Sequence, residues 1–421
     1  MKVLLVNQCF HPDVVSTAQH LTDLAVRLAE LGHDVTVICS SRGYDNPDAR
    51  FAKREVWKRV TVIRVACSGL GKRAKWRRAV DFGSFLISCA FRMILLPRFD
   101  LVVGMTSPPL ISFLAALLAQ LTGSRFVFWV MDLNPDEAIA AGWLRKDSAI
   151  SKGLSAILMH SLRRAEKVLV LDRFMKQRIA DKGIPEQKLA IIPPWSHDDN
   201  VRYDRAGRLG FRANHNLDDK YVVMYSGNHS PCHPLDTLLG AAYRLAEHPE
   251  IAFCFVGGGG EFVKVKSFAE NHGLTNVICL PYQPMNALAA SLSAADLHVV
   301  VMGEPFIGIV HPCKIYNILS IGARFIYVGP SESHVVDIMT RVKSNGLARV
   351  ARHGEVDIVA RHILEAATQS IFTANRRVSV EFANAFSKEV LLSRMVELLE
   401  NSADGTAVYA YSAAKAKAHS V

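Results

Sequence analysis

Residues 2–40 read KVLLVNQCFHPDVVSTAQHLTDLAVRLAELGHDVTVICS, and they contain a unit typical of α/β proteins. A short apolar run at 3–6 is followed by a polar loop, by helical apolar periodicity over 17–31, and by a second apolar run at 35–39. Gly32 stands where the C-terminus of a helix favours a residue that tolerates positive φ. The pattern therefore predicts a strand, a helix and a second, parallel strand.

The same pattern continues along the first half of the chain. Further strands are predicted at 60–65, 101–104, 126–131 and 168–171, with a buried helix at 110–121. Near-continuous apolar strands that alternate with helices are typical of a mostly parallel sheet covered on both faces. Two apolar stretches, 79–97 and 108–131, are interrupted by charged or polar residues, so we predict no transmembrane anchor.

A second α/β series follows a polar stretch. Its predicted strands are 221–225, 251–256, 277–280, 297–301 and 325–328, with helices at 235–246, 263–272, 285–294 and 313–319. A length of 421 residues also indicates two domains. We therefore expect two Rossmann-like, doubly wound parallel-sheet domains that face each other across a cleft: residues 1–195 and 221–380, joined by a linker at 196–220. The last residues, 401–421, are expected to form a mobile tail.

The charge of the chain is concentrated in one segment. The net charge is +10, and residues 42–98 alone contain fourteen basic and four acidic residues. This field attracts an anionic partner, whether nucleic acid, acidic lipid or a phosphorylated substrate. The eight cysteines lack a CxxC pair, which argues against a zinc finger or a disulfide framework, and the apolar run at 3–6 is too short for a secretory signal. We expect a cytoplasmic protein.

The most basic part of this segment is KRAKWRR at 72–78, which contains Lys72, Arg73, Lys75, Trp76, Arg77 and Arg78. An apolar stretch follows it, and cations with an interfacial tryptophan beside an amphipathic segment favour contact with an anionic membrane surface. Nucleic-acid binding is disfavoured because neither an aromatic RNA-binding pattern nor a helix-turn-helix is visible. An ordinary solvated face remains the alternative.

Two loops at predicted strand ends could hold a ligand. The first contains Gly257, Gly258 and Gly259 before a helix, where a backbone can approach an anion, although a plain strand-to-helix turn explains it equally well. The second contains Gly227, Asn228, His229 and His233. Prolines within it argue against a helix that would align the histidines as a zinc pair, and both could simply satisfy hydrogen bonds of the loop.

Three further positions carry candidate chemistry. Lys314 lies in the first turn of a predicted helix, where a cation opposes the helix dipole unless an anion is near. Asp132 directly follows a buried strand and could receive a hydroxyl proton or bind substrate hydroxyls, whereas Asp136 and Glu137 are typical of an acidic first helical turn. His11 lies in the loop after the first strand and is expected to point toward the same cleft.

Five segments together resemble a known family. They are LAVRLAELGHDVTV at 24–37, DLNPD at 132–136, IIPPW at 191–195, FVGGG at 255–259 and KIYNILSIG at 314–322. Each is weak alone, but their order and spacing are similar to those of the family 4 glycosyltransferases of GT-B fold that build bacterial surface polysaccharides. The resemblance covers nearly the whole chain, and it implies a C-terminal helix at 381–400 that packs back on the N-terminal domain.

The resemblance implies transfer of a sugar from a nucleotide-diphosphate donor, held by the C-terminal domain, to an acceptor held by the N-terminal domain. It further implies retention of anomeric configuration without a metal or other cofactor. Basic side chains and helix N-termini then neutralise the diphosphate leaving group. Acceptors of such enzymes are often polyprenyl-diphosphate sugars in the inner leaflet, which fits a peripheral protein on the inner face of the cell membrane.

The chain also departs from the family. The usual Glu-x7-Glu motif would fall on Ile309 and Asn317, and the usual arginine and lysine of the donor loop would fall near Asn228 and His233. Our hypothesis is that Lys314, His229 and His233 neutralise the diphosphate, while Asn317 keeps a ribose hydrogen bond. The predicted catalytic residues are Asp132, Lys314 and His229; the predicted donor-binding residues are Gly227, Asn228, His233, Gly257, Gly258, Gly259, His311, Tyr316 and Asn317; the predicted acceptor-binding residues are His11 and Asp136. A nucleotide-sugar 2-epimerase and a non-catalytic scaffold are the alternatives.

Overall fold

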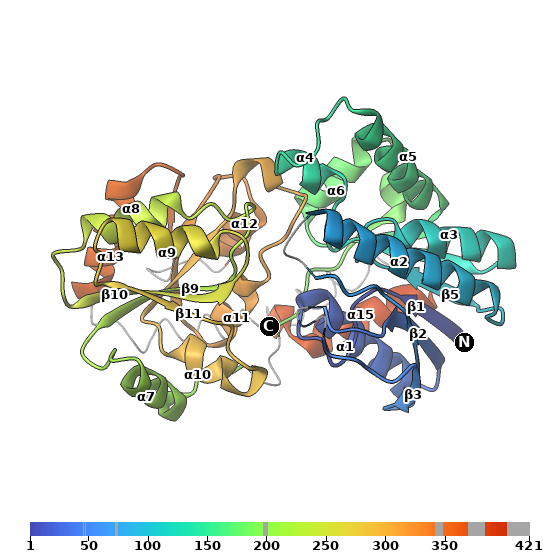
Figure 1. Ribbon diagram of the computed structural model, residues 1–421, viewed down its shortest axis with the longest axis horizontal. Coiled ribbons are helices and arrows are strands. Elements are labelled where there is room, and N and C mark those ends of the chain that lie inside the picture. Colours follow the sequence, from blue (N-terminus) through green and yellow to red (C-terminus); the bar gives the residue numbers. More distant parts are fainter. Residues whose placement is uncertain are drawn as a thin grey trace, which may run out of the picture.

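The structure is a computed structural model that describes residues 1–44, 46, 48–71, 75–196, 201–341, 348–368 and 384–401. Two α/β domains lie side by side, and each is built around its own sheet (Figure 1). Of the positions singled out in the sequence, Lys72, Arg73, the side chain of Lys75 and residues 402–421 lie outside the described residues.

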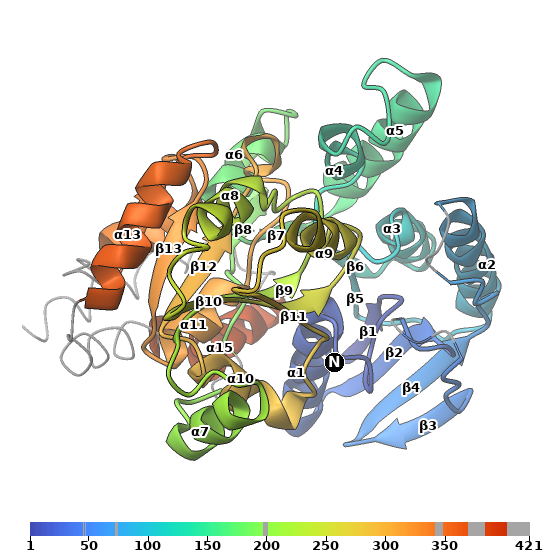
Figure 2. The ribbon, with the colours of Figure 1, turned by 60° about the vertical axis from the view of Figure 1, so that its left-hand side comes forward.

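The described part of the N-terminal domain contains an eight-stranded sheet in the order β3-β4-β2-β1-β5-β6-β7-β8. All neighbouring strands pair in parallel except β3, which is antiparallel to β4 at the edge visible in Figure 2. The strands are β1 (Lys2–Val6), β2 (Asp34–Ser40), β3 (Arg54–Trp57), β4 (Val60–Val65), β5 (Leu101–Gly104), β6 (Arg125–Trp129), β7 (Lys167–Val170) and β8 (Leu189–Ile191). The apolar runs predicted as strands are buried within this sheet.

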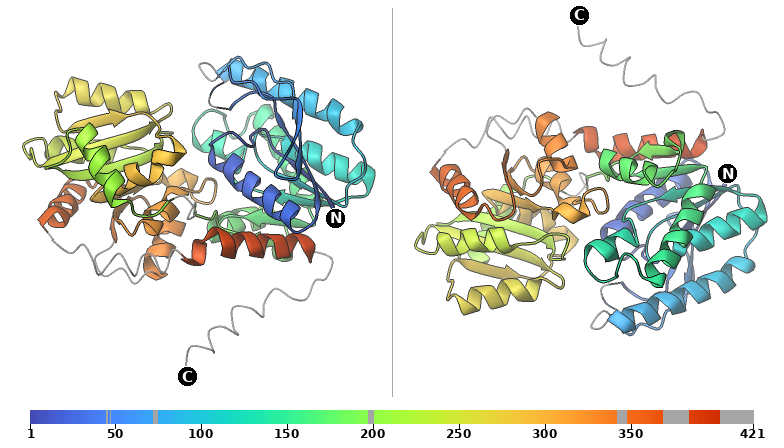
Figure 3. Two further views of the ribbon diagram at one scale, coloured as in Figure 1. Left: turned by 90° about the horizontal axis from the view of Figure 1, so that it is seen from below. Right: turned by 90° about the horizontal axis from the view of Figure 1, so that it is seen from above.

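Helices cover both faces of that sheet. Helices α2 and α3 lie side by side on one face with α5, and α1 lies on the opposite face (Figure 3). Their bounds are α1 (Ser16–Glu30), α2 (Lys75–Ile94), α3 (Ile111–Thr122), α4 (Asp136–Ala140), α5 (Ala149–Arg164) and α6 (Arg173–Ala180). Within the described residues, no helix combines the length and apolar character that a bilayer span requires.

The described part of the C-terminal domain contains a six-stranded parallel sheet in the order β11-β10-β9-β12-β13-β14. Its strands are β9 (Tyr221–Asn228), β10 (Ile251–Gly258), β11 (Val277–Leu280), β12 (Leu297–Val301), β13 (Arg324–Val328) and β14 (Ala348–Ala351). Its helices include α8 (Asp236–Arg244), α9 (Phe262–Asn271), α10 (Leu288–Ser293), α11 (Lys314–Ser320), α12 (His334–Arg341) and α13 (Val356–Thr368). The strand order reverses between β9 and β12, where open α/β sheets bind ligands.

The segment predicted as a linker, 196–220, contains helix α7 (Arg205–Asn214). Asp204 caps it by accepting from the backbone N–H of Gly207 at 2.8 Å. Arg208 and Arg212 both form ion pairs with Asp296, which joins the helix to the C-terminal domain. The helix is anchored by arginine–carboxylate pairs rather than by an apolar stripe, so apolar periodicity did not reveal it.

Helix α15 (Lys388–Glu400) returns the chain to the N-terminal domain, where it lies against α1 (Figure 3). Its buried face is apolar, and its N-terminal end is held by ion pairs. Glu389 pairs with Arg27 at 2.9 Å, and Lys388 pairs with Asp23 at 2.8 Å. The chain therefore crosses between the two domains twice, which limits how far they can separate.

Candidate active site

The carboxyl ends of the two sheets meet through loops of both domains. The backbone N–H of Leu133, after β6, donates to the carbonyl of Ile309, after β12, at 2.9 Å. The guanidinium of Arg178 on α6 donates twice to the carbonyl of Ile307, at 3.1 and 2.9 Å. The first contact joins two loops at strand ends, and the second joins α6 to the loop after β12, so the predicted catalytic residues of the two domains face a common region.

The glycines after β9 and β10 let these two loops pack directly on each other. Gly257 has φ +136°, and a Cβ there would lie 2.1 Å from the carbonyl oxygen of Gly227. A Cβ on Gly259, at φ +130°, would lie 2.4 Å from the carbonyl oxygen of His229. The close approach lets the N–H of His229 donate to the carbonyl of Gly258 at 2.8 Å. The glycines thus fix the position of His229.

Lys314 is the first residue of α11 and presents an unpaired ammonium group. Its side chain is half-buried, but its Nζ is fully buried and forms no hydrogen bond with any described residue. The Nζ lies 3.6 Å from the ring centroid of Tyr225, and the absent side chain of Gly227 leaves room for it. Burial lowers the pKa of Lys314 to about 7. The unliganded site therefore holds a desolvated cation that an anion would stabilise.

The two loop histidines are neutral in this environment. His229 donates from Nδ1 to the carbonyl of Gly227 at 3.0 Å, and His233 donates from Nδ1 to the carbonyl of Val301 at 2.8 Å. Burial, with the charge of Lys314, lowers the pKa of His229 to about 4 and that of His233 to about 3. At pH 7 only Lys314 of the three provides positive charge. The two histidines are therefore uncharged and do not offer a diphosphate a positive charge.

The buried Nε2 of His229 is instead a hydrogen-bond acceptor. Because Nδ1 carries the proton in the bond to Gly227, Nε2 holds a lone pair, and it forms no hydrogen bond with any described residue. Such a nitrogen requires a donor, and a sugar or ribose hydroxyl supplies one. His229 is thus suited to a hydroxyl of a donor sugar rather than to a phosphate oxygen.

Asp132 follows β6 and lies beside a second carboxyl group. Burial and the neighbouring charge of Glu137 raise the pKa of Asp132 to about 7. Glu137 lies in the first turn of α4 as predicted, and its Oε2 accepts from Asn134 Nδ2 at 3.0 Å. Its Oε1 accepts from the Cys232 thiol of the C-terminal domain at 3.9 Å. Asp132 is therefore poised near neutral pH to gain or lose a proton at the domain boundary.

Four of the predicted ligand residues already have partners within the protein. His311 donates from Nδ1 to Asp172 Oδ2, and its Nε2 forms a hydrogen bond with the hydroxyl of Tyr316, both at 2.7 Å. Asp136 forms an ion pair with Lys182 at 2.8 Å. The ring of His11 stacks on Trp57 of β3 with centroids 4.0 Å apart. Two further candidates are Asn317, which is half-buried on α11 and also has a partner, and Asn228, which is exposed at the end of β9.

Sequence reasoning missed Asp172, which links the domains. Asp172 caps α6 by accepting from the N–H of Met175 at 2.8 Å, and its other oxygen meets His311 and His334 of the C-terminal domain. Burial alone would raise the pKa of Asp172, but the hydrogen bond and charge of His311 lower it to about 2. Carboxylate and imidazole groups can bind a metal ion. Here, however, the rings of His311 and His334 stack with their centroids 3.7 Å apart and an interplanar angle of 24°, so their nitrogen lone pairs lie in nearly parallel planes. The cluster is explained as a hydrogen-bonded link between domains.

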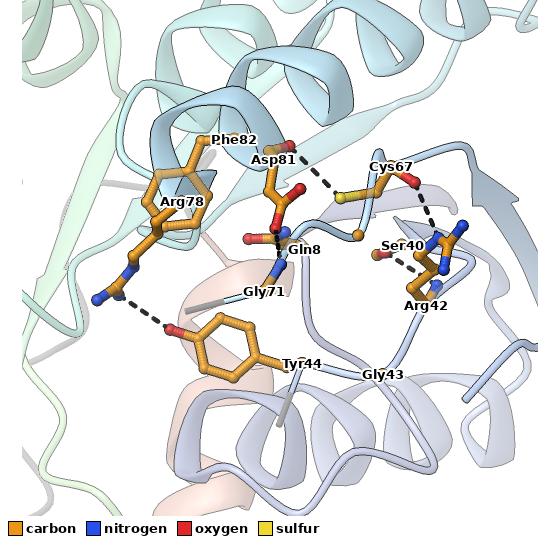
Figure 4. Close-up of a pocket in the computed structure, with 11 residues that line it drawn as sticks. Gln8, Ser40, Arg42, Gly43, Tyr44, Cys67, Gly71, Arg78, Asp81 and Phe82 are labelled. Carbon is orange, nitrogen blue, oxygen red and sulfur yellow. Dashed lines mark hydrogen bonds between the residues drawn. The ribbon is translucent and has the colours of Figure 1, made fainter. Parts of the chain in front are cut away.

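A hollow in the N-terminal domain was also missed. It lies at the carboxyl ends of β1, β2 and β4 and beside the start of α2 (Figure 4). We call it the N-terminal hollow and define it by Gln8, Arg42, Tyr44, Arg78 and Asp81. Arg78, predicted to face a membrane, is exposed, lines this hollow and donates to the hydroxyl of Tyr44 at 3.2 Å. Because the lining comes from four separate segments, no single stretch of sequence indicates it.

Two family models match the chain, one in each domain. The model described as Glycosyl transferase 4-like domain matches residues 17–195, and the model described as Glycosyl transferases group 1 matches residues 209–310. The chain is also 27% identical over 340 residues to the putative colanic acid biosynthesis glycosyl transferase WcaI of Escherichia coli (strain K12). That alignment covers 77% of this chain and 83% of the relative.

Solved structures share the whole fold. Sucrose-phosphate synthase from Thermosynechococcus elongatus superposes with a TM-score of 0.73 at 15% identity, covering 95% of this chain and 98% of the other. HepE of Anabaena, solved in complex with UDP and glucose, superposes with a TM-score of 0.70 at 14% identity, covering 95% and 99%. With a matching glycosyltransferase family model on each domain and two parallel-sheet domains in this arrangement, the chain belongs to the family 4 glycosyltransferases of GT-B fold.

Proposed function

We propose that the protein transfers a sugar from a nucleotide-diphosphate sugar to a lipid-linked glycan at a membrane surface, with retention of configuration and without a metal. The observation that carries the proposal is the buried, unpaired ammonium of Lys314 at the switch point of the C-terminal sheet. Desolvating this group without a partner is costly, and a diphosphate offsets that cost when it binds.

Glycosyl transfer breaks the bond between the anomeric carbon and the diphosphate oxygen, so negative charge develops on the leaving group. A cation held beside that oxygen stabilises the transition state more than the ground state. Lys314 supplies that charge in place of a divalent ion. The Nε2 of His229 accepts a hydrogen bond from a hydroxyl group of the nucleotide sugar. Support for a nucleotide-sugar donor also comes from the similar fold of HepE, which was solved with UDP and glucose.

The acceptor side of the reaction is assigned to Asp132. Its pKa near 7 lets the carboxylate hold an acceptor hydroxyl and take up the proton that is lost as the new glycosidic bond forms. Glu137 raises that pKa and also contacts Cys232 of the opposite domain, so the basicity of Asp132 depends on a residue at the domain boundary. This role agrees with an acceptor bound by the N-terminal domain.

Helix α2 supports a membrane-bound acceptor. Trp76, Ile87, Phe91 and Ile94 recur at helical spacing along its outer face and are 61%, 61%, 69% and 77% exposed. Its opposite face packs into the core through Phe85 and other buried residues. An exposed apolar stripe of this length, flanked by Arg77, Arg92 and Arg98, fits the boundary between headgroups and acyl chains of an anionic membrane. We assign the protein to the inner face of the cell membrane on this basis.

A binding screen tests the donor part of the proposal. Thermal unfolding is measured with UDP, GDP and ADP and their sugars, in the presence of EDTA. At least one nucleoside diphosphate should raise the melting temperature of the unmodified protein, and Lys314→Ala should abolish that rise. A protein that responds to none of them would be a non-catalytic scaffold.

Vesicle flotation tests the membrane part. The double variant F91E/I94E should bind vesicles of phosphatidylethanolamine and phosphatidylglycerol at least tenfold more weakly, because two exposed apolar anchors become anionic. The matched control is Val263→Glu, which changes a side chain that is 67% exposed on α9 of the other domain. Equal flotation of the double variant and the unmodified protein would refute the assignment of α2.

A further inference from the structure

The aromatic ring of Tyr225 lies beneath the unpaired ammonium of Lys314. The Nζ of Lys314 is 3.6 Å from the ring centroid, so the cation sits over the face of the ring. Further along the same strand, a Cβ on Gly227 would lie 3.4 Å from both Cε and Nζ of Lys314. The ammonium therefore rests against the ring and the backbone of β9, at the carboxyl end of the strand.

The attraction between these two side chains is that of a cation for a neutral ring. Burial raises the pKa of Tyr225 well above its ordinary value, so the phenol keeps its proton at neutral pH. The hydroxyl donates that proton to the carbonyl of Asn228 at 2.8 Å. A phenolate is thus excluded as an anionic partner of Lys314, and the electron-rich face of the ring supplies the attraction.

The ring is held rigidly, whereas the lysine side chain is flexible. Tyr225 is 1% exposed and belongs to the core of the C-terminal domain. Its hydroxyl is tied to the loop through Asn228, and the ring of Phe255 on β10 lies beside it with centroids 6.5 Å apart. The long side chain of Lys314 starts from α11 and could place its Nζ in many positions. The fixed ring therefore selects one of them.

The same ring contacts the second group that the proposed function uses. The rings of Tyr225 and His229 meet edge to face, with centroids 4.9 Å apart and an interplanar angle of 70°. The ammonium of Lys314 and the imidazole of His229 are therefore both placed with respect to Tyr225. Because this arrangement exists in the unliganded protein, fewer side chains have to be ordered when a nucleotide sugar binds.

We infer that Tyr225 is a positioning residue for donor binding: the face of its ring holds the Lys314 ammonium at the carboxyl end of β9, both before and after a diphosphate binds. This role rests on the proposed function, in which Lys314 meets the diphosphate. Tyr225 acts through Lys314 and does not itself bind the nucleotide sugar. Removing the ring should therefore weaken donor binding only while Lys314 is present.

A double-mutant cycle in donor binding tests the inference. The probe is whichever of UDP, GDP and ADP gives the largest thermal shift, and its dissociation constant is measured by calorimetry at pH 8. Tyr225→Leu should raise this constant about fivefold in the unmodified protein but less than twofold in the Lys314→Met background. Tyr225→Phe keeps the ring and should stay within twofold of the unmodified protein. In Tyr225→Leu the affinity should also begin to fall at a pH below 7, because the free ammonium has lost the ring.

A second measurement of the same contact needs no nucleotide. Denaturant unfolding is compared at pH 6, where Lys314 is an ammonium, and at pH 9, where it is neutral. Tyr225→Leu should raise the equilibrium constant of unfolding about fivefold more at pH 6 than at pH 9, and equally at both in the Lys314→Met background. The matched control is Phe255→Leu, which removes an equally buried ring from the paired strand and should have the same effect at both pH values.

Three results would overturn the role of Tyr225. They are an equal loss of affinity with and without Lys314, a loss in Tyr225→Phe as large as that in Tyr225→Leu, and an effect of Tyr225→Leu on unfolding that does not depend on pH. In each case Tyr225 would act through the loop or its hydroxyl rather than through the ammonium. Failure of the proposed function is a different result, namely that the unmodified protein binds none of the nucleoside diphosphates, and the unfolding cycle then still decides whether the ring holds Lys314.

Discussion

Replacing Lys314 with methionine removes the buried charge and keeps most of the side-chain volume. The pKa of Lys314 lies at about 7 instead of its ordinary 10.5 because the ammonium is desolvated. A shift of this size corresponds to as much as about 5 kcal/mol. Since the side chain as a whole is half-buried, we expect Lys314→Met to raise the free energy of unfolding by about 2 to 4 kcal/mol at pH 7.

The pH dependence of this gain has a defined sign. The folded protein binds the proton of Lys314 less readily than the unfolded chain does, so the penalty is absent above about pH 10.5 and grows as the pH falls toward 7. Denaturant unfolding of both proteins between pH 6 and 9.5 measures it. The difference in stability should be largest at the acidic end and should shrink as the pH rises.

Binding of the nucleotide-sugar donor should offset the cost of burying the Lys314 ammonium. A bound diphosphate favours the ammonium form of Lys314, so binding above pH 7 takes up a proton. The dissociation constant of the nucleoside diphosphate should rise by up to tenfold per pH unit above 7 in the unmodified protein and stay flat in Lys314→Met. At pH 7 the variant should bind about 10 to 100 times more weakly.

The exposed Lys264 provides the matched control, because Lys264→Met removes the same charge from a side chain that is 71% exposed and pairs with Glu261 on the loop after β10. It should leave stability, affinity and pH profile unchanged. The reasoning is refuted if Lys314→Met binds nucleoside diphosphates as tightly as the unmodified protein, or if the affinity of the unmodified protein does not vary between pH 7 and 9.

Three further outcomes are expected. Asp132→Asn should lower kcat at least a hundredfold with little change in donor binding, and kcat of the unmodified enzyme should rise with pH through about 7, where Asp132 ionises; a variant within twofold of normal would exclude this role. Gly257→Ala should destabilise the protein by about 3 kcal/mol or more in denaturant unfolding, because its Cβ would collide with the carbonyl of Gly227, whereas Gly260→Ala meets no atom within 4 Å. Asp172, with its pKa lowered to about 2, contributes about 2 kcal/mol above pH 4 that disappears as the pH falls toward 2. Asp172→Asn should therefore lower the free energy of unfolding at pH 7 and reduce its decrease between pH 4 and pH 2. The same decrease in the variant and in the unmodified protein would contradict this role.

Most strands could be predicted from the sequence because a parallel strand covered on both faces is an unbroken apolar run. The exceptions are β3, β8 and β14. Each is an edge strand of three or four residues with partly exposed side chains, so it lacks such a run. Helix α7 lacks an apolar stripe of the expected kind because Arg208 and Arg212 anchor it through Asp296. Local patterns therefore indicate elements that bury apolar surface and miss those held by charge.

The site was predictable where one loop carries its own signal. Lys314 could be singled out because a cation in the first turn opposes the helix dipole, and its Nζ is indeed buried without a partner among the described residues. The neutral state of His229 and His233 could not be predicted from the sequence, because it depends on burial and on the nearby charge of Lys314. The partnership of Asp172 with His311 joins residues 139 positions apart, and only the fold brings them together.

The central claim is that the C-terminal domain balances a departing diphosphate with Lys314 while the sugar passes to a lipid-linked acceptor. The most direct measurement incubates the protein with radiolabelled nucleotide sugars and bacterial membrane lipids in EDTA, and then counts the label that partitions into the organic phase. The account predicts label in the lipid fraction at a rate that EDTA does not change and that Lys314→Met reduces at least tenfold. Label that stays in the aqueous phase with every donor, or transfer that stops in EDTA and resumes with manganese, would contradict it.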